Sequence, residues 1–375
     1  MRRRPSPTMA SMRAMRGRLL MGAAGVVVAT TAMSGCSAIA PPTTAEVDGP
    51  TASGRIGDDE LLRAIRPTFT GADDVVAVAL VDGDEVRTAF IDASHDTVFE
   101  TGSITKTFTG LLLADAIERG EVELDDTLGD HLDLGTSAAA SVTLGDLAAH
   151  RSGLPTFPTD PAWRERVEPG FNAGEDVIDE TVDELLTQAA AETLPPDPQP
   201  TYSNMGAALV GQALAAAAGM EYQDLVGERI LEPLGLDGAS LPVEDDEVPA
   251  GLAQGWTPDG TPAEPSTLGA YAPAGGIAAT IDDLVAYATG VIDGPFADSA
   301  ALEPRPGLEG GSIGYFWGVT DEGGHRTVAH DGMTAGFNSS LVIDLTAGTA
   351  AIVLVNRADG SATGVARRLF ALAGD

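Results

Sequence analysis

Segments typical of β-strands occur near both ends of this chain, and the segments between them are typical of helices. Residues 75–81 and 86–91 are rich in β-branched side chains and flank an Asp-Gly-Asp turn, which predicts a hairpin. Further strands are predicted at 313–319, 327–330, 339–343 and 350–355. This order predicts an α+β fold: one antiparallel sheet is built from both chain ends and flanked by helices, and a mainly helical lobe, about 120–290, is inserted.

Apolar periodicity predicts the helices. A stripe of apolar residues with acidic residues at its start indicates a first helix at 58–65. Helical periodicity recurs at 105–119, 144–150, 181–191, 205–218, 281–292 and 363–372. Proline-rich stretches at 155–161 and 195–200 are predicted breaks. Because clefts favour the seam between two packed lobes, we expect a site between the sheet and the helical lobe.

The first 35 residues are typical of an export signal, with six arginines, no acidic residue and a short apolar stretch at 19–32. The only cysteine, Cys36, follows Met33-Ser34-Gly35, which resembles the lipobox of bacterial lipoproteins, although leucine is more usual than Met33. We therefore expect a signal peptide at 1–35, lipidation of Cys36 and anchoring on the extracellular face of the membrane. A plain cleaved signal, which would give a secreted protein, is the alternative.

Residues 36–57 are rich in Pro, Thr, Ala and Gly and lack apolar periodicity, which predicts a flexible, lipid-anchored stalk before a folded domain at 58–375. The formal net charge of the whole chain is −35, which argues against nucleic-acid binding because such a surface repels phosphate. No phosphate-binding loop or metal-ligand cluster is apparent, so no cofactor and no metal are expected. We expect a monomer that contacts the membrane only through its anchor.

Lys106 is the only lysine in a chain that has 20 arginines. Lysine can lose its proton near neutral pH when it is buried, and arginine cannot, so this position is a candidate general base. Ser103 precedes it by three residues, which on a helix places both side chains on one face at the N-terminus. A serine hydroxyl is a poor nucleophile until a base takes its proton. The alternative interpretation is a capping serine followed by a surface lysine.

Two further groups of residues complete a candidate site. Tyr202 stands in a loop before a predicted helix, where a phenol can share a proton with Lys106, and Asn204 can bridge the lysine and a substrate amide. A packing tyrosine beside a helix-capping asparagine is the alternative. His330 ends a predicted strand and can orient a substrate carboxylate or modulate the base, unless it is an ordinary hydrogen-bonded histidine. Gly332 allows close approach of a ligand, and the amide of Met333 can pair with that of Ser103 as an oxyanion hole.

In this order, the three groups resemble the serine penicillin-recognising superfamily, in the branch that holds class C β-lactamases, D-alanyl-D-alanine carboxypeptidases and related esterases. The resemblance runs from about residue 58 to 373. It rests on F-E-T-G-S-I-T-K-T-F-T-G (99–110), L-x-D-L-x-x-H-x-S-G-L (144–154), Y-S-N-x-G (202–206), L-E-P-L-G-L (231–236), A-G-G-I-A-A-T (274–280) and H-D-G (330–332).

The resemblance implies that Ser103 forms an acyl-enzyme, that Lys106 and Tyr202 share the general-base and general-acid work, and that Asn204 and the His330 strand hold the substrate. Many relatives carry Lys-Thr-Gly where this chain has the His-Asp-Gly sequence, and the missing second lysine argues against fast β-lactam hydrolysis. His150, within the second motif, is expected to be structural.

The expected substrate is a small-molecule or peptidoglycan-derived acyl compound, because anchoring outside the membrane places the enzyme near peptidoglycan. A D-alanyl-D-alanine carboxypeptidase-like or related amide hydrolase is the favoured function. A carboxylesterase or weak β-lactamase on the same fold is the alternative, and a non-catalytic cell-wall-binding lipoprotein is a third hypothesis.

A rival motif surrounds Ser312, in Gly310-Gly311-Ser312-Ile313-Gly314, which fits the G-x-S-x-G pattern of α/β-hydrolases. That pattern requires a strand before the serine and a helix after it. Here a glycine-rich loop precedes the serine and a predicted strand follows, so Ser312 is not expected to be the nucleophile.

Overall fold

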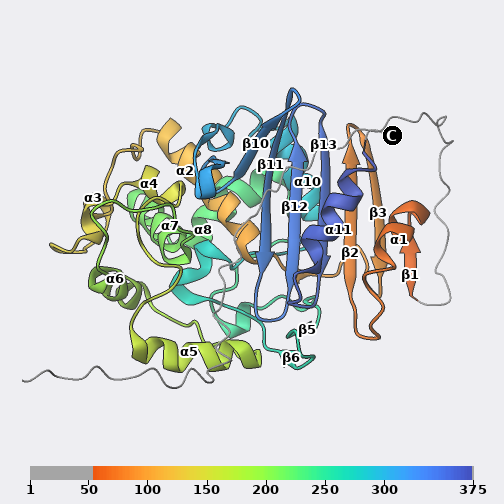
Figure 1. Ribbon diagram of the computed structural model, residues 1–375, viewed down its shortest axis with the longest axis horizontal. Helices are drawn as coiled ribbons and strands as arrows, with labels where there is room; N and C mark the ends of the chain where they lie inside the picture. Colours follow the sequence, from red (N-terminus) through yellow and green to blue (C-terminus); the bar gives the residue numbers. More distant parts are fainter. Residues whose placement is uncertain (1–53, 374–375) are drawn as a thin grey trace, which may run out of the picture.

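In a computed structural model that describes residues 54–373, nine strands of the described part form one antiparallel sheet (Figure 1). Its order is β1-β3-β2-β13-β12-β11-β10-β9-β8. The N-terminal strand β2 pairs along its whole length with the C-terminal strand β13, so the sheet joins both chain ends and the predicted α+β fold is confirmed. The strands are β1 (Arg55–Gly57), β2 (Val76–Asp82), β3 (Glu85–Ile91), β8 (Arg305–Pro306), β9 (Ser312–Ile313), β10 (Gly318–Glu322), β11 (His325–Met333), β12 (Asn338–Asp344) and β13 (Thr349–Val355).

The central strands are apolar on both faces because helices cover both sides of the sheet. Alternate residues of β2, Val76, Val78 and Leu80, pack in one hydrophobic cluster with α1 (Asp59–Ile65) and α11 (Ser361–Phe370). Ala77 and Ala79 point to the opposite face and belong to the larger cluster. A strand buried on both faces is expected to read as a continuous apolar run, as this one does.

The remaining helices form the lobe beside the sheet, drawn mostly in yellow and green in Figure 1. They are α3 (Leu128–His131), α4 (Leu144–Ala148), α5 (Pro161–Ala173), α6 (Val182–Ala191), α7 (Asn204–Ala218), α8 (Tyr222–Val226) and α9 (Glu232–Leu234). Helix α2 (Thr105–Glu118) contacts α7 and the 3₁₀ segment η5 (Gly269–Ala274). α10 (Ile281–Ile292) falls in the range predicted for the lobe, yet it packs on β2, β12 and β13.

Three sequence-based predictions, one for the stalk and two for strands, need correction. Residues 55–57, predicted to end the stalk, form β1 on the edge of the sheet against β3. The strand predicted at 313–319 is interrupted between β9 and β10 by a tight turn in which Phe316 has φ +62°. The turn is held by distant partners, because Tyr315 donates to the carbonyl of Ala301 and Phe316 to that of Ala148. Strand β11 continues beyond 330 to Met333, so His330 lies within the strand and not at its end.

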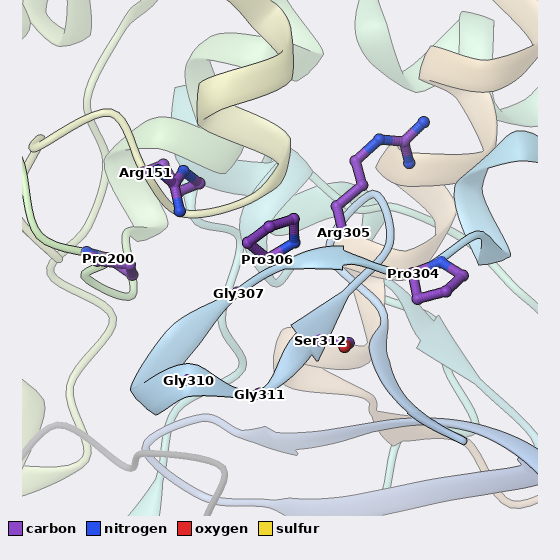
Figure 2. A pocket seen from close by; sticks show the side chains of 9 residues that line it. All are labelled: Arg151, Pro200, Pro304, Arg305, Pro306, Gly307, Gly310, Gly311 and Ser312. Carbon is purple, nitrogen blue, oxygen red and sulfur yellow. The ribbon is translucent and has the colours of Figure 1, made fainter.

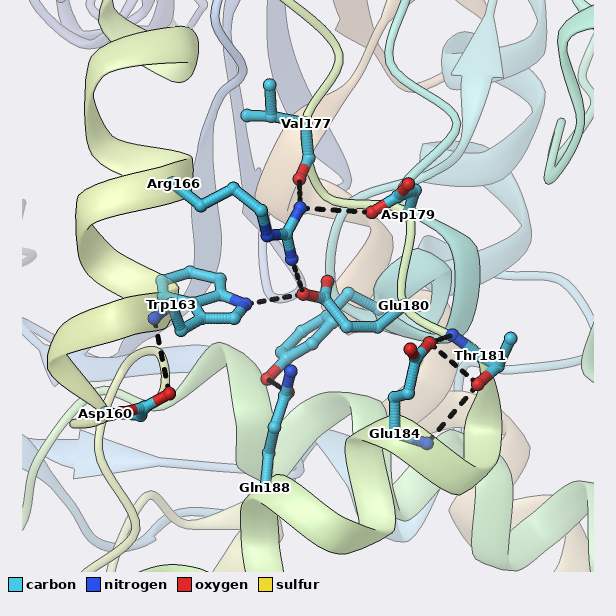
Figure 3. Close-up of polar contacts among 10 residues, drawn as sticks. Asp160, Trp163, Arg166, Val177, Asp179, Glu180, Thr181, Glu184 and Gln188 are labelled. Carbon is cyan, nitrogen blue, oxygen red and sulfur yellow. Dashed lines mark hydrogen bonds and ion pairs between the residues drawn. The ribbon is translucent and has the colours of Figure 1, made fainter.

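Polar contacts made by α5, by α6 and by the loop that joins them hold η5 in place (Figure 3). η5 is the segment that reaches the candidate site. Arg166 and Trp163 of α5 both donate to one carboxylate oxygen of the buried Glu180. The backbone carbonyl of Glu180 then accepts from Ala270 at the start of η5, at 2.7 Å, and Tyr271 donates to Gln188 of α6 at 3.0 Å. These bonds fix the backbone that ends at Ala274.

The predicted signal peptide at 1–35, the predicted lipidation at Cys36 and the stalk up to residue 53 lie outside the described residues. Between residues 54 and 373, none of the helices combines the length and apolar character needed to span a bilayer.

Candidate active site

Ser103 lies in a short 3₁₀ turn, Gly102–Ile104, that continues directly into α2. The turn requires glycine at 102, where φ is +53°. A Cβ on Gly102 would lie 2.6 Å from the backbone nitrogen of Met333, so the turn and the end of β11 are in direct backbone contact. The structure therefore brings the amide of Met333 next to the turn that carries Ser103, as the oxyanion-hole hypothesis requires.

Lys106 is completely buried, because α2 is enclosed by the lobe and by η5. Its Nζ lies 3.0 Å from Ser103 Oγ and 2.5 Å from the carbonyl oxygen of Ala274. Within residues 54–373 no carboxylate forms an ion pair with it. Burial without a counter-charge holds the pKa of Lys106 well below its ordinary value. A lysine in this setting can accept the proton of a hydroxyl beside it.

Tyr202 completes a three-residue cluster with this pair. The Lys106 Nζ lies 5.0 Å from the centroid of the Tyr202 ring, and the phenol hydrogen-bonds the Ser103 side chain. Desolvation raises the pKa of Tyr202, and the nearby charge of Asp331 adds to the effect. The phenol therefore holds its proton and can deliver it when a stronger base forms beside it.

His150 holds the loop that carries Tyr202. It lies just beyond α4, with φ +56°, although a helix was predicted through residue 150. Its carbonyl accepts from Thr201, its Nδ1 accepts from the Ser203 N–H at 3.2 Å, and its ring centroid lies 4.6 Å from that of Tyr202. Burial, followed by the charge of Lys106, holds its pKa well below the ordinary value. These contacts fit the structural role expected for His150.

Asn204 is the first residue of α7, after the N-cap Ser203. Its Oδ1 is buried and has no hydrogen-bond partner within the described residues. An unsatisfied buried acceptor is costly, so this amide is suited to pairing with a ligand N–H.

His330 is nearly buried on β11, and its ring centroid lies 6.3 Å from that of Tyr202. Its Nδ1 lies 2.7 Å from the carbonyl oxygen of Asp331, which can only accept, so Nδ1 carries the proton. Burial lowers the pKa of His330 to about 3, with a further contribution from the charge of Lys106. His330 is therefore neutral near pH 7 and supplies no positive charge at this position.

Gly332 sets the distance between β11 and the Ser103 turn. A Cβ at this position would overlap the carbonyl oxygen of Thr101, two residues before the serine. That carbonyl also accepts from Ser339 of β12 at 2.7 Å. Glycine is thus needed here for strand packing against the turn, whereas the sequence suggested approach of a ligand.

Glu100 is a buried acid that the sequence patterns did not single out. It lies on the short strand β4 (Phe99–Glu100), three residues before Ser103. Its Oε1 accepts from the backbone of Ser266 at 2.7 Å, and its Oε2 is buried without a partner in the described part of the chain. Burial raises the pKa of Glu100 to about 7. The sequence signal that could have found it is the position of this acid between Phe99 and Thr101, in the motif that contains Ser103.

Ser312 lies elsewhere, as an exposed residue of the short strand β9, which pairs with β10 and with the edge strand β8. It borders a cavity of about 560 Å³, drawn in Figure 2, whose lining is Arg151, Pro200, Pro304, Arg305, Pro306, Gly307, Gly310, Gly311 and Ser312. A 3₁₀ turn precedes the serine and a tight turn follows, so the strand and helix that a G-x-S-x-G nucleophile needs are both missing here. Residues 54–373 contain no group of His, Cys, Asp and Glu side chains arranged to hold a metal ion.

Comparison with known families identifies the fold and the broad chemistry. A family model described as Beta-lactamase matches residues 65–374. The chain is 26% identical over 317 residues to penicillin-binding protein 4 of Amycolatopsis lactamdurans, which covers 78% of this chain and 80% of that protein. It is 31% identical over 160 residues to the D-alanyl-D-alanine-carboxypeptidase/endopeptidase AmpH of Escherichia coli K12, a match that covers 40% of this chain and 39% of that one.

Solved structures show the same fold. The crystal structure of a beta-lactamase/D-alanine carboxypeptidase from Pseudomonas syringae superimposes with a TM-score of 0.73, at 18% sequence identity, and covers 84% of this chain and 99% of that one. A class C beta-lactamase superimposes with a TM-score of 0.72, at 18% identity, over 84% of this chain.

Proposed function

Because this chain belongs to the beta-lactamase family and is a serine hydrolase, we propose that it is a D-alanyl-D-alanine carboxypeptidase-like enzyme that works through an acyl-enzyme on Ser103. One observation carries the proposal: Ser103 Oγ lies 3.0 Å from Nζ of a lysine that is completely buried and has no carboxylate partner within residues 54–373. The names of two relatives, a penicillin-binding protein and a D-alanyl-D-alanine carboxypeptidase, support the choice of substrate.

Acylation follows from the positions of the three side chains. Ser103 Oγ attacks the carbonyl carbon of the substrate while its proton passes to Lys106 Nζ. The carbonyl oxygen gains negative charge, which the backbone N–H groups of Ser103 and Met333 stabilise. When the C–N bond breaks, the leaving amine takes the proton of Tyr202, and Lys106 returns a proton to the phenolate.

Deacylation reverses the roles of the same groups. A water molecule replaces the departed amine, and its oxygen attacks the ester carbon while one proton passes through the Tyr202 hydroxyl to the neutral Lys106 Nζ. The C–Oγ bond then breaks, Ser103 recovers its proton, and the carboxylic acid leaves. Asn204, with its unpaired Oδ1, holds the amide N–H of the acyl group through both steps.

A carboxylesterase is the second candidate, and the neutral protonation state of His330 supports it. Since burial lowers the pKa of His330 to about 3, this position contributes no cation for the carboxylate of a β-lactam or peptide. Neutral esters need no such cation. Efficient β-lactam hydrolysis is the least supported activity for the same reason.

A three-substrate comparison tests the proposal. D-alanine release from a stem-peptide mimic, hydrolysis of a nitrophenyl ester and hydrolysis of a chromogenic cephalosporin are measured on wild type and on Ser103→Ala. The proposal predicts that the peptide has the highest kcat/KM and that every activity disappears in the variant. Faster ester than peptide turnover selects the esterase. No covalent mass shift with any of these substrates favours a non-catalytic cell-wall-binding lipoprotein.

We also propose export and lipid anchoring at Cys36, which rest on the N-terminal sequence. Metabolic labelling with a fatty acid is expected to tag wild type and not Cys36→Ala, and the variant is expected to leave the membrane fraction. Unlabelled wild type in the medium supports a plain cleaved signal.

A further inference from the structure

Arg151 is a cation without a partner in a strongly acidic protein. It lines the cavity of Figure 2 and, within residues 54–373, its guanidinium has neither an ion pair nor a hydrogen bond. Other arginines, such as Arg229 and Arg326, are each paired with two carboxylates. With a net charge of −35, acidic partners are plentiful, so an unpaired guanidinium at a cavity wall is suited to an external anion.

Arg305, the second arginine of the cavity, already has interaction partners within the protein. Arg305 lies 4.3 Å over the ring of Tyr315 and donates to its hydroxyl at 3.1 Å, and also bonds the carbonyls of Ala300 and Glu303. In Figure 2 its side chain extends away from Arg151 and from the glycines of the opposite wall. Arg305 therefore forms part of the wall, and Arg151 is the guanidinium free to bind a ligand.

The cavity adjoins the Tyr202 side of the candidate site. Arg151 follows His150, whose ring lies 4.6 Å from that of Tyr202, and the other wall residue, Pro200, precedes Tyr202 by two positions. The Thr201 N–H bonds the carbonyl of His150, which ties the two segments together. If Tyr202 protonates the leaving amine, the leaving portion of a substrate lies beside the Tyr202 loop, to which both wall residues, Arg151 and Pro200, are joined.

The basic side chains closer to the site, Lys106 and His330, are not available to pair with a substrate carboxylate. Lys106 is buried, is bonded to Ser103 and Ala274, and has a pKa held well below its ordinary value by burial. His330 carries its proton on Nδ1 and gives it to a backbone carbonyl. A substrate that ends in a free carboxylate therefore needs a counter-charge from outside the catalytic cluster.

We propose that Arg151 binds a carboxylate on the leaving portion of the substrate, through the paired N–H groups of its guanidinium. The substrate class is a peptide or N-acyl amino acid with a free C-terminal carboxylate. The assignment rests on the proposed function, because it places the leaving group on the Tyr202 side. A planar guanidinium matches a carboxylate with two parallel hydrogen bonds, which makes Arg151 a specificity-determining residue.

Binding to a protein that cannot turn over tests the proposal. Affinities of N-acetyl-D-alanyl-D-alanine and of its C-terminal amide are measured by calorimetry on Ser103→Ala, alone and combined with Arg151→Gln or with Arg305→Gln. The free acid is expected to bind Ser103→Ala about tenfold or more tightly than the amide. Arg151→Gln is expected to remove this preference, whereas the matched variant Arg305→Gln is expected to keep it. Thermal melting verifies that each variant is folded.

Several results overturn the proposal: equal affinity for acid and amide, no detectable binding of the acid, or a preference that survives Arg151→Gln. A separate measurement tests the proposed function: if protein that retains Ser103 shows no acyl-enzyme mass shift, the proposed function fails. A carboxylate preference that depends on Arg151, together with no acyl-enzyme, supports the binding site and rejects the peptidase.

Discussion

Two serines of this chain stand in glycine-containing motifs, and their surroundings differ sharply. Ser103 lies at the start of a buried helix with Lys106 Nζ 3.0 Å from its oxygen. Ser312 lies exposed on the two-residue strand β9, and its hydroxyl has no hydrogen-bond partner within residues 54–373. The contrast teaches that the two motifs differ in having a buried base beside the serine, because burial is what lowers the pKa of Lys106.

The largest expected effect comes from changing the base and keeping its charge. Lys106→Arg is expected to reduce the acylation rate by about 10²- to 10⁴-fold, since a guanidinium cannot take the serine proton. Stopped-flow acylation with an activated ester measures the rate, and circular dichroism verifies the fold. Acylation at the wild-type rate in this variant rules out Lys106 as the base and removes the distinction between the two serines.

Backbone packing gives the next test, by adding one methyl group in each region. Gly332→Ala is expected to cost about 2–3 kcal/mol of unfolding free energy, because its Cβ overlaps the Thr101 carbonyl beside the Ser103 turn. Gly311→Ala, beside Ser312, is expected to change stability by less than about 0.5 kcal/mol, since its Cβ meets only the Leu308 carbonyl at 3.2 Å. Urea unfolding of both variants measures the difference, and equal costs contradict the tight packing described for the Ser103 region.

The buried carboxyl group of Glu100, near Ser103, is expected to make the free energy of unfolding depend on pH. Burial raises the pKa of Glu100 from 4.5 to about 7. Below pH 4.5 the acid is protonated in both the folded and unfolded states and costs nothing. Between pH 4.5 and about 7 only the unfolded state ionises, so stability falls as pH rises, by about 3 kcal/mol in total.

Glu100→Gln is expected to remove this loss. The variant gains stability relative to wild type at about pH 8 and not at about pH 4, as urea unfolding at both values will measure. A difference between wild type and variant that is the same at both pH values contradicts a raised pKa for Glu100.

The smallest effect is expected at the second serine. Ser312→Ala is expected to leave stability within about 0.5 kcal/mol and turnover within about twofold of wild type, because the exposed hydroxyl touches no reacting group. Substrate turnover and thermal melting measure both quantities. A large loss of turnover would instead support Ser312 as the nucleophile of a G-x-S-x-G motif.

Short sequence patterns predicted the features that neighbouring residues determine, namely the central strands and the Ser103–Lys106 pair. The apolar runs of β2 and β13 predicted strands because both faces of those strands are covered. The serine and lysine were found from their spacing and from the rarity of lysine. Helix α5, which begins at the last residue of the predicted break at 155–161, was missed, although Asp160 caps its start and Pro161 is its first residue, a common way for a helix to begin.

Features that depend on distant partners could not be predicted. The turn at Phe316 is held by carbonyls of Ala148 and Ala301, which lie far away in the sequence. The raised pKa of Glu100 comes from its burial by distant segments and is opposed by the hydrogen bond from Ser266, and no short pattern encodes that environment. The state of His330 likewise follows from its burial, so the replacement of lysine by histidine could be noticed in the sequence while its neutrality could not.

The most direct test of the account is the site of the covalent bond. Intact-mass spectrometry after incubation with an activated aryl ester is expected to show one acyl group on wild type and on Ser312→Ala, none on Ser103→Ala, and peptide mapping is expected to place it on Ser103. An acyl group that persists on Ser103→Ala, or that maps to Ser312, contradicts the account.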